Sequence, residues 1–177
     1  MSFWNISEIP DDLTIDWEGR LVNDNGTTVF LVAGRCRPVS GVNQSVGGVA
    51  YFAGDLYHSW TDQASDTTNQ RTVLLAIENA LERAIDIGLD NVVIMTDSEN
   101  SVKSLTVLHE QWRSTYGDGI WRNAKRKPVK NQDVMKRCLK LMEADILVQV
   151  SWIRRRDNDI VNKMAKTASH GDTESDY

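Results

Sequence analysis

One aspartate in the sequence stands where α/β proteins often place a metal ligand. The segment VVIMTDSENSV (92–102) is an apolar run that ends abruptly at Thr96, Asp97 and Ser98. The carboxyl end of a buried strand is a common place for ligand-binding side chains, and a carboxylate there suits a hard divalent cation. The position of Asp97 alone leaves open whether it belongs to a complete metal site.

The segments around Asp97 predict an α/β fold. The β-rich segment TTVFLVAGRC (27–36) and a predicted hairpin at 49–60 precede a helical repeat of apolar residues over 73–84. The strand that ends at Asp97, further helices, a strand at 146–153 and a final helix follow. Early antiparallel strands followed by alternating strands and helices imply a mixed sheet with helices on its faces.

Length and composition are typical of an intracellular globular protein. The chain has 177 residues, of which 41% are hydrophobic and 25% charged, which fits one domain with a sizeable core. No apolar run reaches the length of a membrane span, no signal peptide is evident, and two cysteines suit a reducing compartment. We therefore expect a nuclear or cytoplasmic protein. The net charge of −5 argues against a uniformly basic DNA-binding surface, but not against a local basic patch.

Four segments occur in the order and spacing of a type-1 ribonuclease H. They are TTNQRTVLLAIENAL, VVIMTDSENSV, GIWRNAKRKPVKNQDV and VQVSWIRRRDNDIVNKMAKTA. From about Thr28 to Ala168 the chain resembles that family, in its eukaryotic form. The resemblance implies a ribonuclease-H-like fold, with a five-stranded mixed sheet flanked by helices. We expect an irregular N-terminal extension at 1–25, the ribonuclease-H-like domain at 26–168 and a disordered tail at 169–177.

The family cuts the RNA strand of RNA–DNA hybrids with two magnesium ions held by a carboxylate cluster. Several carboxylates are needed because two dications repel each other and each prefers oxygen ligands. The four ligand positions of the family fall on Ala33, Val73, Asp97 and Asn162. Only Asp97 keeps a carboxylate, and the family's histidine-bearing segment before the last helix is absent. The resemblance therefore implies a degenerate site, with no enzymatic activity, no bound metal and no cofactor.

Three further acids lie near these positions. Asp159 is one helical turn before Asn162, Glu99 lies just beyond Asp97, and Glu78 follows Val73 by five residues. Asp97 paired with Asp159 or Glu99 leaves open the binding of one metal ion with low affinity. It does not provide two properly spaced metals.

A second set of residues matches the family's contacts to nucleic acid. The TNQ segment contacts phosphate and the minor-groove edge of the hybrid in that family. The matching and neighbouring residues are Cys36, Thr68, Asn69, Gln70, Trp112, Trp121, Arg122, Lys125, Arg126, Lys127 and Asn131. Each also has a structural explanation: Thr68, Asn69 and Asn131 suit helix caps, and a tryptophan at helical spacing suits a core. Asp66 opposes binding, because the family places a phosphate-contacting arginine there.

These observations favour a non-catalytic module that binds another protein of an RNA-processing or RNA-silencing assembly. The alternative is a non-catalytic binder of RNA–DNA hybrid or RNA, supported by the TNQ segment and by the basic stretch at 122–130. A residually active ribonuclease H is the third hypothesis. We expect no membrane partner. The Arg154–Arg156 cluster supplies positive charge on a different surface or contacts an acidic partner protein.

Overall fold

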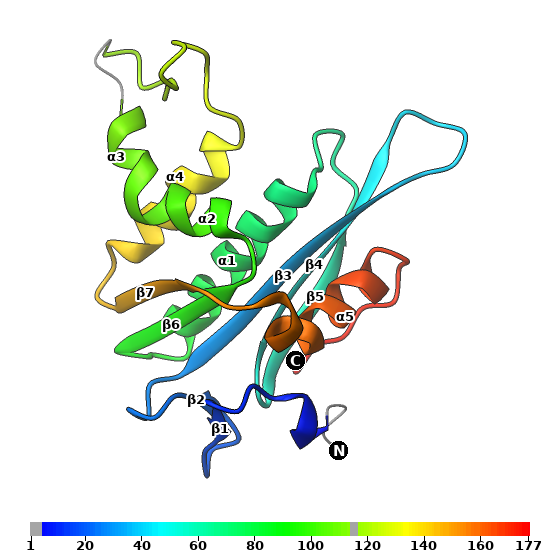
Figure 1. Cartoon of the computed structure of the whole chain (residues 1–177), viewed down its shortest axis with the longest axis vertical. Helices are drawn as coiled ribbons and strands as arrows, with labels where there is room; N and C mark the ends of the chain where they lie inside the picture. Colours follow the sequence, from blue (N-terminus) through cyan, green and yellow to red (C-terminus); the bar gives the residue numbers. More distant parts are fainter. Residues whose placement is uncertain (1–4, 114–116) are drawn as a thin grey trace.

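The main feature of the fold is one mixed β-sheet. The computed structural model describes residues 5–113 and 117–177, so residues 1–4 of the predicted N-terminal extension lie outside the described part. The five strands have the spatial order β5-β4-β3-β6-β7 (Figure 1). Their bounds are β3 (Val29–Pro38), β4 (Ser45–Ala53), β5 (Leu56–Asp62), β6 (Asn91–Thr96) and β7 (Leu147–Trp152). β3, β4 and β5 are antiparallel neighbours, whereas β6 pairs parallel with β3 and β7 parallel with β6.

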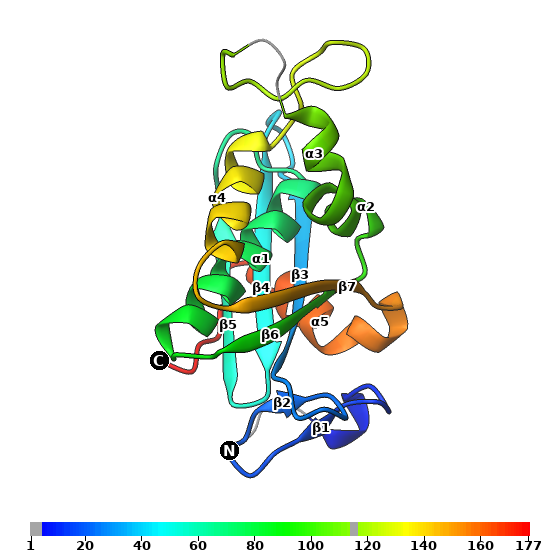
Figure 2. The same cartoon turned by 90° about the vertical axis from the view of Figure 1, so that its left-hand side faces the viewer.

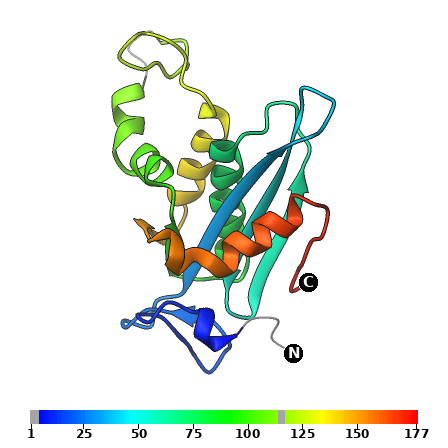
Figure 3. The same cartoon turned by 45° about the vertical axis from the view of Figure 1, so that its right-hand side comes forward.

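Helices cover both faces of this sheet, which confirms the predicted arrangement. α1 (Asn69–Asp86) and α4 (Gln132–Met142) lie on one face, and α5 (Asp159–Ala168) crosses the other (Figures 2 and 3). After β6 the chain forms one bent helical stretch made of α2 (Glu99–Lys103), a π-helical turn η2 (Ser104–Leu108) and α3 (His109–Trp112). A 3-10 turn, η3 (Arg155–Asn158), leads into α5. None of the helices in the described ranges combines the length and apolarity needed to cross a bilayer.

The sequence pattern explains α1 well. The Thr68 hydroxyl accepts a hydrogen bond from the backbone N–H of Arg71 at 3.2 Å, which caps the first turn. The predicted apolar repeat at Val73, Ile77, Leu81 and Ala84 is buried in the core. The helix ends before Gly88, whose φ of +74° is a conformation that glycine adopts at little cost.

Two glycines allow the helices to approach the sheet closely. A Cβ atom added at Gly34 of β3 would overlap the backbone of Val73 in α1, and one at Gly48 of β4 would overlap the Ala165 carbonyl in α5. The two helices lie on opposite faces, so a helix packs closely against each face of the middle strands. This packing fixes the positions of the residues that line the cleft described below.

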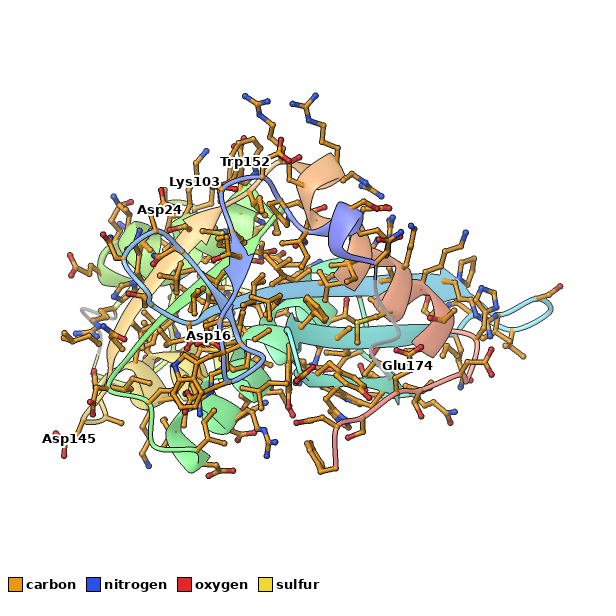
Figure 4. All side chains as sticks on the ribbon, turned by 90° about the horizontal axis from the view of Figure 1, so that it is seen from below. Asp16, Asp24, Lys103, Asp145, Trp152 and Glu174 are labelled. Carbon is orange, nitrogen blue, oxygen red and sulfur yellow. The ribbon has the colours of Figure 1, made fainter. Side chains whose placement is uncertain are left out.

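The described parts of both terminal segments also lie on the domain. The N-terminal segment forms η1 (Ile6–Glu8) and a small two-stranded sheet of β1 (Thr14–Ile15) and β2 (Leu21–Val22). At the other end, the Ser59 N–H donates to the Glu174 carbonyl at 2.7 Å, and the Asp176 N–H donates to the Tyr57 carbonyl at 3.0 Å. Glu174 is labelled on this C-terminal segment in Figure 4. The segment predicted as a disordered tail thus runs beside β5. The proposed division at residues 25 and 168 stays a prediction.

Replacing Gly48 by alanine should destabilise the protein by about 3 kcal/mol, because the added methyl group must displace the backbone of α5. Urea unfolding followed by circular dichroism measures the change in the free energy of unfolding. Gly41→Ala is the comparison: no atom lies within 4 Å there, so only the positive φ of 82° opposes the methyl group and the expected loss is about 1 kcal/mol. Equal losses would show that α5 does not pack as closely as described.

Candidate nucleic-acid interface

Asp97 lies directly after β6, at the carboxyl end of the strand. Ser98 caps α2 by accepting a hydrogen bond from the Ser101 N–H at 3.3 Å, and Thr96 Oγ1 accepts one from the Ser98 N–H at 3.2 Å. The Asp97 carboxylate instead faces the last helix, where its Oδ2 accepts a hydrogen bond from Asn162 Nδ2 at 3.1 Å. Neighbouring hydroxyl groups therefore cap the helix, and the Asp97 side chain joins β6 to α5.

A cavity of about 320 Å³ surrounds this pair of side chains. Its lining is mostly polar and consists of Gly34, Arg35, Asn69, Gln70, Val73, Asp97, Ser98, Asn100, Arg155 and Asn162. We call it the cleft. Three of the four positions that match the family's metal ligands, Val73, Asp97 and Asn162, meet here. The fourth, Ala33, is 1% exposed in β3 next to Gly34.

The side chains of the cleft do not fit a pair of magnesium ions. In the described ranges, no three or more histidine, cysteine, aspartate or glutamate side chains are grouped as a metal ion would require. The three neighbouring acids considered above have other partners. Glu78 pairs with Arg137, Asp159 with Lys163 at 2.9 Å, and Glu99 with Lys103 at 3.3 Å. Asp97 is thus the one carboxylate among the cleft residues, and one carboxylate cannot offset the charge of two dications.

The TNQ segment forms the start of α1 at the edge of the cleft. Asn69 Oδ1 accepts a hydrogen bond from the backbone N–H of Cys36 at 2.7 Å, which ties β3 to the first turn of α1. Gln70 and Asn69 line the cleft on one side and a second cavity, of about 650 Å³, on the other. The two cavities therefore form neighbouring parts of one polar surface.

Asn131 also lies in the second cavity, together with Thr68 and Lys130. It precedes α4 in a left-handed conformation, with φ of 59°, and its side chain makes no capping hydrogen bond. The structural explanation of Asn131 as a side-chain cap therefore does not hold. The structure does place Asn131 with the TNQ segment, as the resemblance implies.

Arg71 is held by acids in the second cavity. Its guanidinium donates to both carboxylate oxygens of Asp133, at 3.0 and 2.8 Å, and lies 3.5 Å from Asp66. These hydrogen bonds from Arg71 lower the pKa of Asp133 to about 2. The two acids balance the charges of Arg71 and Lys130, so this cavity offers amide and hydroxyl groups rather than net positive charge.

The basic stretch at 122–130 forms a largely exposed loop. Asn123 Oδ1 accepts hydrogen bonds from the backbone N–H groups of Lys125 and Lys127, and Arg126 has a positive φ of 59°. Lys125, Arg126 and Lys127 are all exposed. Arg122 differs, because its guanidinium is bound to Asp118 at 3.0 and 2.7 Å.

The two tryptophans of the set that matches the family's nucleic-acid contacts pack against the protein. Trp121 is 7% exposed and belongs to the core, with the Lys136 ammonium 5.3 Å from the centre of its ring. Trp112 is partly buried against the same core. Packing against the core agrees with the structural explanation of both tryptophans, and their contact with nucleic acid stays a prediction.

Sequence reasoning missed Arg35 as a site residue and assigned Arg155 to a different surface. Arg155, in η3, lines the cleft, whereas Arg156 pairs with Asp157 at 3.6 Å. Arg35 follows Ala33 by two residues in β3, and side chains two apart on a strand share a face. That spacing was the signal that would have placed Arg35 beside a family ligand position.

A family model described as RNase H matches residues 35–171. The chain belongs to the RNase H family. A Ribonuclease H of Ruthia magnifica is 30% identical over 141 residues, which cover 77% of this chain and 88% of that protein. A Ribonuclease H of Treponema pallidum is 33% identical over 101 residues, or 57% of each chain. The chain spans a little over half the length of several such RNase H relatives.

Solved structures show the RNase H-like fold. RNase H1 from the archaeon Halobacterium salinarum aligns with a TM-score of 0.53 and 18% identity, over 81% of this chain and 98% of that one. A foamy viral protease-reverse transcriptase, solved in complex with RNA/DNA hybrid, aligns with a TM-score of 0.61 and 22% identity. That match covers 81% of this chain and 20% of the viral protein.

The relatives correct the expected function. The sequence predicted a catalytically inactive scaffold, whereas the curated relatives carry the name Ribonuclease H, an enzyme. That prediction was wrong because it treated the loss of three carboxylates as the loss of activity. The two curated relatives described above are bacterial, so the likeness to the eukaryotic form stays a prediction.

Asp133→Asn should reduce the loss of stability in acid. The native pKa of about 2 lies below the ordinary 3.8, so the carboxylate contributes stability above pH 3.8 that is lost as the pH falls toward 2. The variant should unfold more readily at pH 7 and show a flatter dependence between pH 4 and pH 2, measured by thermal melting. Asp145→Asn, at another exposed acid, is the control. A variant that keeps the wild-type slope would contradict the role of Arg71.

Asn162→Asp should place a second carboxylate against Asp97 and bind Mg²⁺ about tenfold more tightly than the wild type. Without metal, repulsion between the two carboxylates should lower the melting temperature at pH 7. Titration calorimetry with MgCl₂ and thermal melting measure the two effects. The swapped variant Asp97→Asn with Asn162→Asp keeps one acid and one amide, so it should behave like the wild type. Unchanged Mg²⁺ affinity in Asn162→Asp would show that the two side chains do not share a site.

Proposed function

We propose that this RNase H-family chain binds RNA–DNA hybrids and hydrolyses their RNA strand. The observation that carries the proposal is the shared lining of the two cavities, with Asn69 and Gln70 between the cleft and the second cavity. The names of the curated relatives support the reaction, and the viral structure with RNA/DNA hybrid supports the substrate.

The geometry suits recognition of a hybrid by shape. Amide and hydroxyl groups of Thr68, Asn69, Gln70 and Asn131 can both donate to and accept from the 2′-hydroxyl and base-edge groups of a minor groove. The exposed cations Lys125, Arg126 and Lys127 suit the phosphate backbone at a distance from these groups. The amide surface would read the groove while the basic loop adds affinity that does not depend on sequence.

Hydrolysis needs a group that takes up the proton of the attacking water. The water oxygen bonds to phosphorus, the bond from phosphorus to the ribose oxygen breaks, and that oxygen takes up a proton from solvent water and leaves as a hydroxyl group. Among the described residues of the cleft, the Asp97 carboxylate is the group suited to accept the proton released by the water. Asn162 holds Oδ2, so we assign the proton to Oδ1.

Asp97→Ala should reduce cleavage of a hybrid labelled on its RNA strand by about a hundredfold, because the proton acceptor is lost. Hybrid affinity should stay within about threefold of the wild type, since the TNQ segment and the basic loop are intact. Gel-resolved cleavage and fluorescence anisotropy measure the two quantities on the full chain.

Asp90→Ala is the matched control, because Asp90 is an exposed acid just before the same strand, at the end away from the cleft. It should leave both quantities unchanged. Hybrid that binds but is never cut by the wild type would overturn the hydrolytic part of the proposal. Absence of binding at low salt would overturn all of it.

A further inference from the structure

The cleft carries more positive than negative charge. Its charged lining residues are Arg35 and Arg155, each with one positive charge, and Asp97 with one negative charge, which leaves one net positive charge. A cleft that held a pair of dications would need the opposite balance. The charge therefore suits an anion.

Arg35 is positioned for a ligand that accepts hydrogen bonds. It lies in β3 on the same face as Ala33, with its side chain half-buried. Its Nε is buried and has no hydrogen-bond partner within the described ranges. By contrast, Arg37 Nε, two residues further along the strand, donates to the Ser169 carbonyl at 2.7 Å. A buried donor without an acceptor costs about 1–3 kcal/mol, so an acceptor in the cleft would relieve that cost.

Arg155 brings a second guanidinium to the cleft lining, from η3 rather than from β3. It lies in η3, it is exposed, and no acid of the described part of the chain forms an ion pair with it. Other arginines are held by acids, including Arg71 by Asp133 and Arg137 by Glu78. Neither arginine of the cleft forms an ion pair within the described ranges, so the lining keeps its one net positive charge.

We propose that Arg35 and Arg155 bind a backbone phosphate of the hybrid directly, without a bridging divalent cation. The proposal deepens the proposed function and rests on it. A guanidinium matches the planar, two-acceptor geometry of a phosphate and carries its charge permanently. Ser98, Asn100 and Asn162 add uncharged hydrogen-bonding groups around the same cavity. Direct binding also explains the residues at the family's ligand positions, because a cluster of carboxylates here would bind the arginines instead of the phosphate.

The test compares two neighbouring arginines in the full chain. Arg155→Glu should weaken binding of an RNA–DNA hybrid about tenfold and reduce the slope of log affinity against log salt by about one, because one phosphate contact is lost. Arg154→Glu makes the same charge change at the adjacent exposed residue, which does not line the cleft, and should weaken binding by less than about threefold. Wild-type affinity should be the same in EDTA as in MgCl₂.

Two further measurements separate the possible failures. Reversing Lys125, Arg126 and Lys127 tests the basic loop alone: if only this variant loses binding, hybrid is bound but the cleft arginines are not involved, and the inference is overturned. Pyrophosphate should raise the melting temperature of the wild type and of Arg154→Glu, but not of Arg155→Glu. Protection by pyrophosphate without hybrid binding would keep the phosphate site and overturn the proposed function.

Binding that requires Mg²⁺, or equal losses in Arg154→Glu and Arg155→Glu, would overturn the inference. Arg35→Gln extends the test to the half-buried partner, with Arg37→Gln as the control on the same face of β3. Thermal melting of each variant shows whether it is folded at the temperature of the binding assay. If both are folded, Arg35→Gln should lose affinity and Arg37→Gln should keep it.

Discussion

The close approach of two helices to the middle strands of the sheet is the constraint on which the rest of the structure depends. Because Gly34 has no side chain, α1 can pack closely against one face of the sheet, and Gly48 allows α5 to do the same on the other face. Because interiors are packed at the density of organic crystals, a side chain at either position would move a whole helix. The cleft is made from the ends of these same elements, so its geometry follows from the backbone contacts rather than from the polar residues that line it.

With the backbone fixed, the balance of charged side chains decides which ligand groups the cleft suits. One acid, Asp97, faces an amide rather than a second acid, and two arginines lie in the same cavity. In the neighbouring cavity the balance differs, because Asp66 and Asp133 hold Arg71. The same polar surface thus has one part suited to an anion and one part suited to uncharged hydrogen-bonding groups. A hybrid offers both kinds of group, with phosphates along its strands and hydroxyl groups in its minor groove.

The sequence predicted the fold because local and long-range signals agree. The apolar repeat of α1, its Thr68 cap and the abrupt end of β6 at Thr96 all indicate the elements that form. Through the family's motifs it singled out Asp97 as a ligand position and Asn69 and Asn131 as candidate contacts to nucleic acid, and these residues line the two cavities. The sequence did not predict the ion pairs, since Glu78 and Arg137, which form one of them, are 59 residues apart in the chain. It also failed on activity, because missing ligands were read as missing function.

Residues 174–177 cover part of the edge strand β5. Residues 174–176 hydrogen-bond along β5, and Tyr177 stacks on His58 with 5.2 Å between ring centres. An uncovered edge strand is a template for pairing with another chain, and many proteins protect such edges against aggregation. Here the chain's own end occupies part of that edge. Removing these residues would therefore expose backbone hydrogen-bonding groups at this edge, so residues 174–177 bear on solubility as well as on shape.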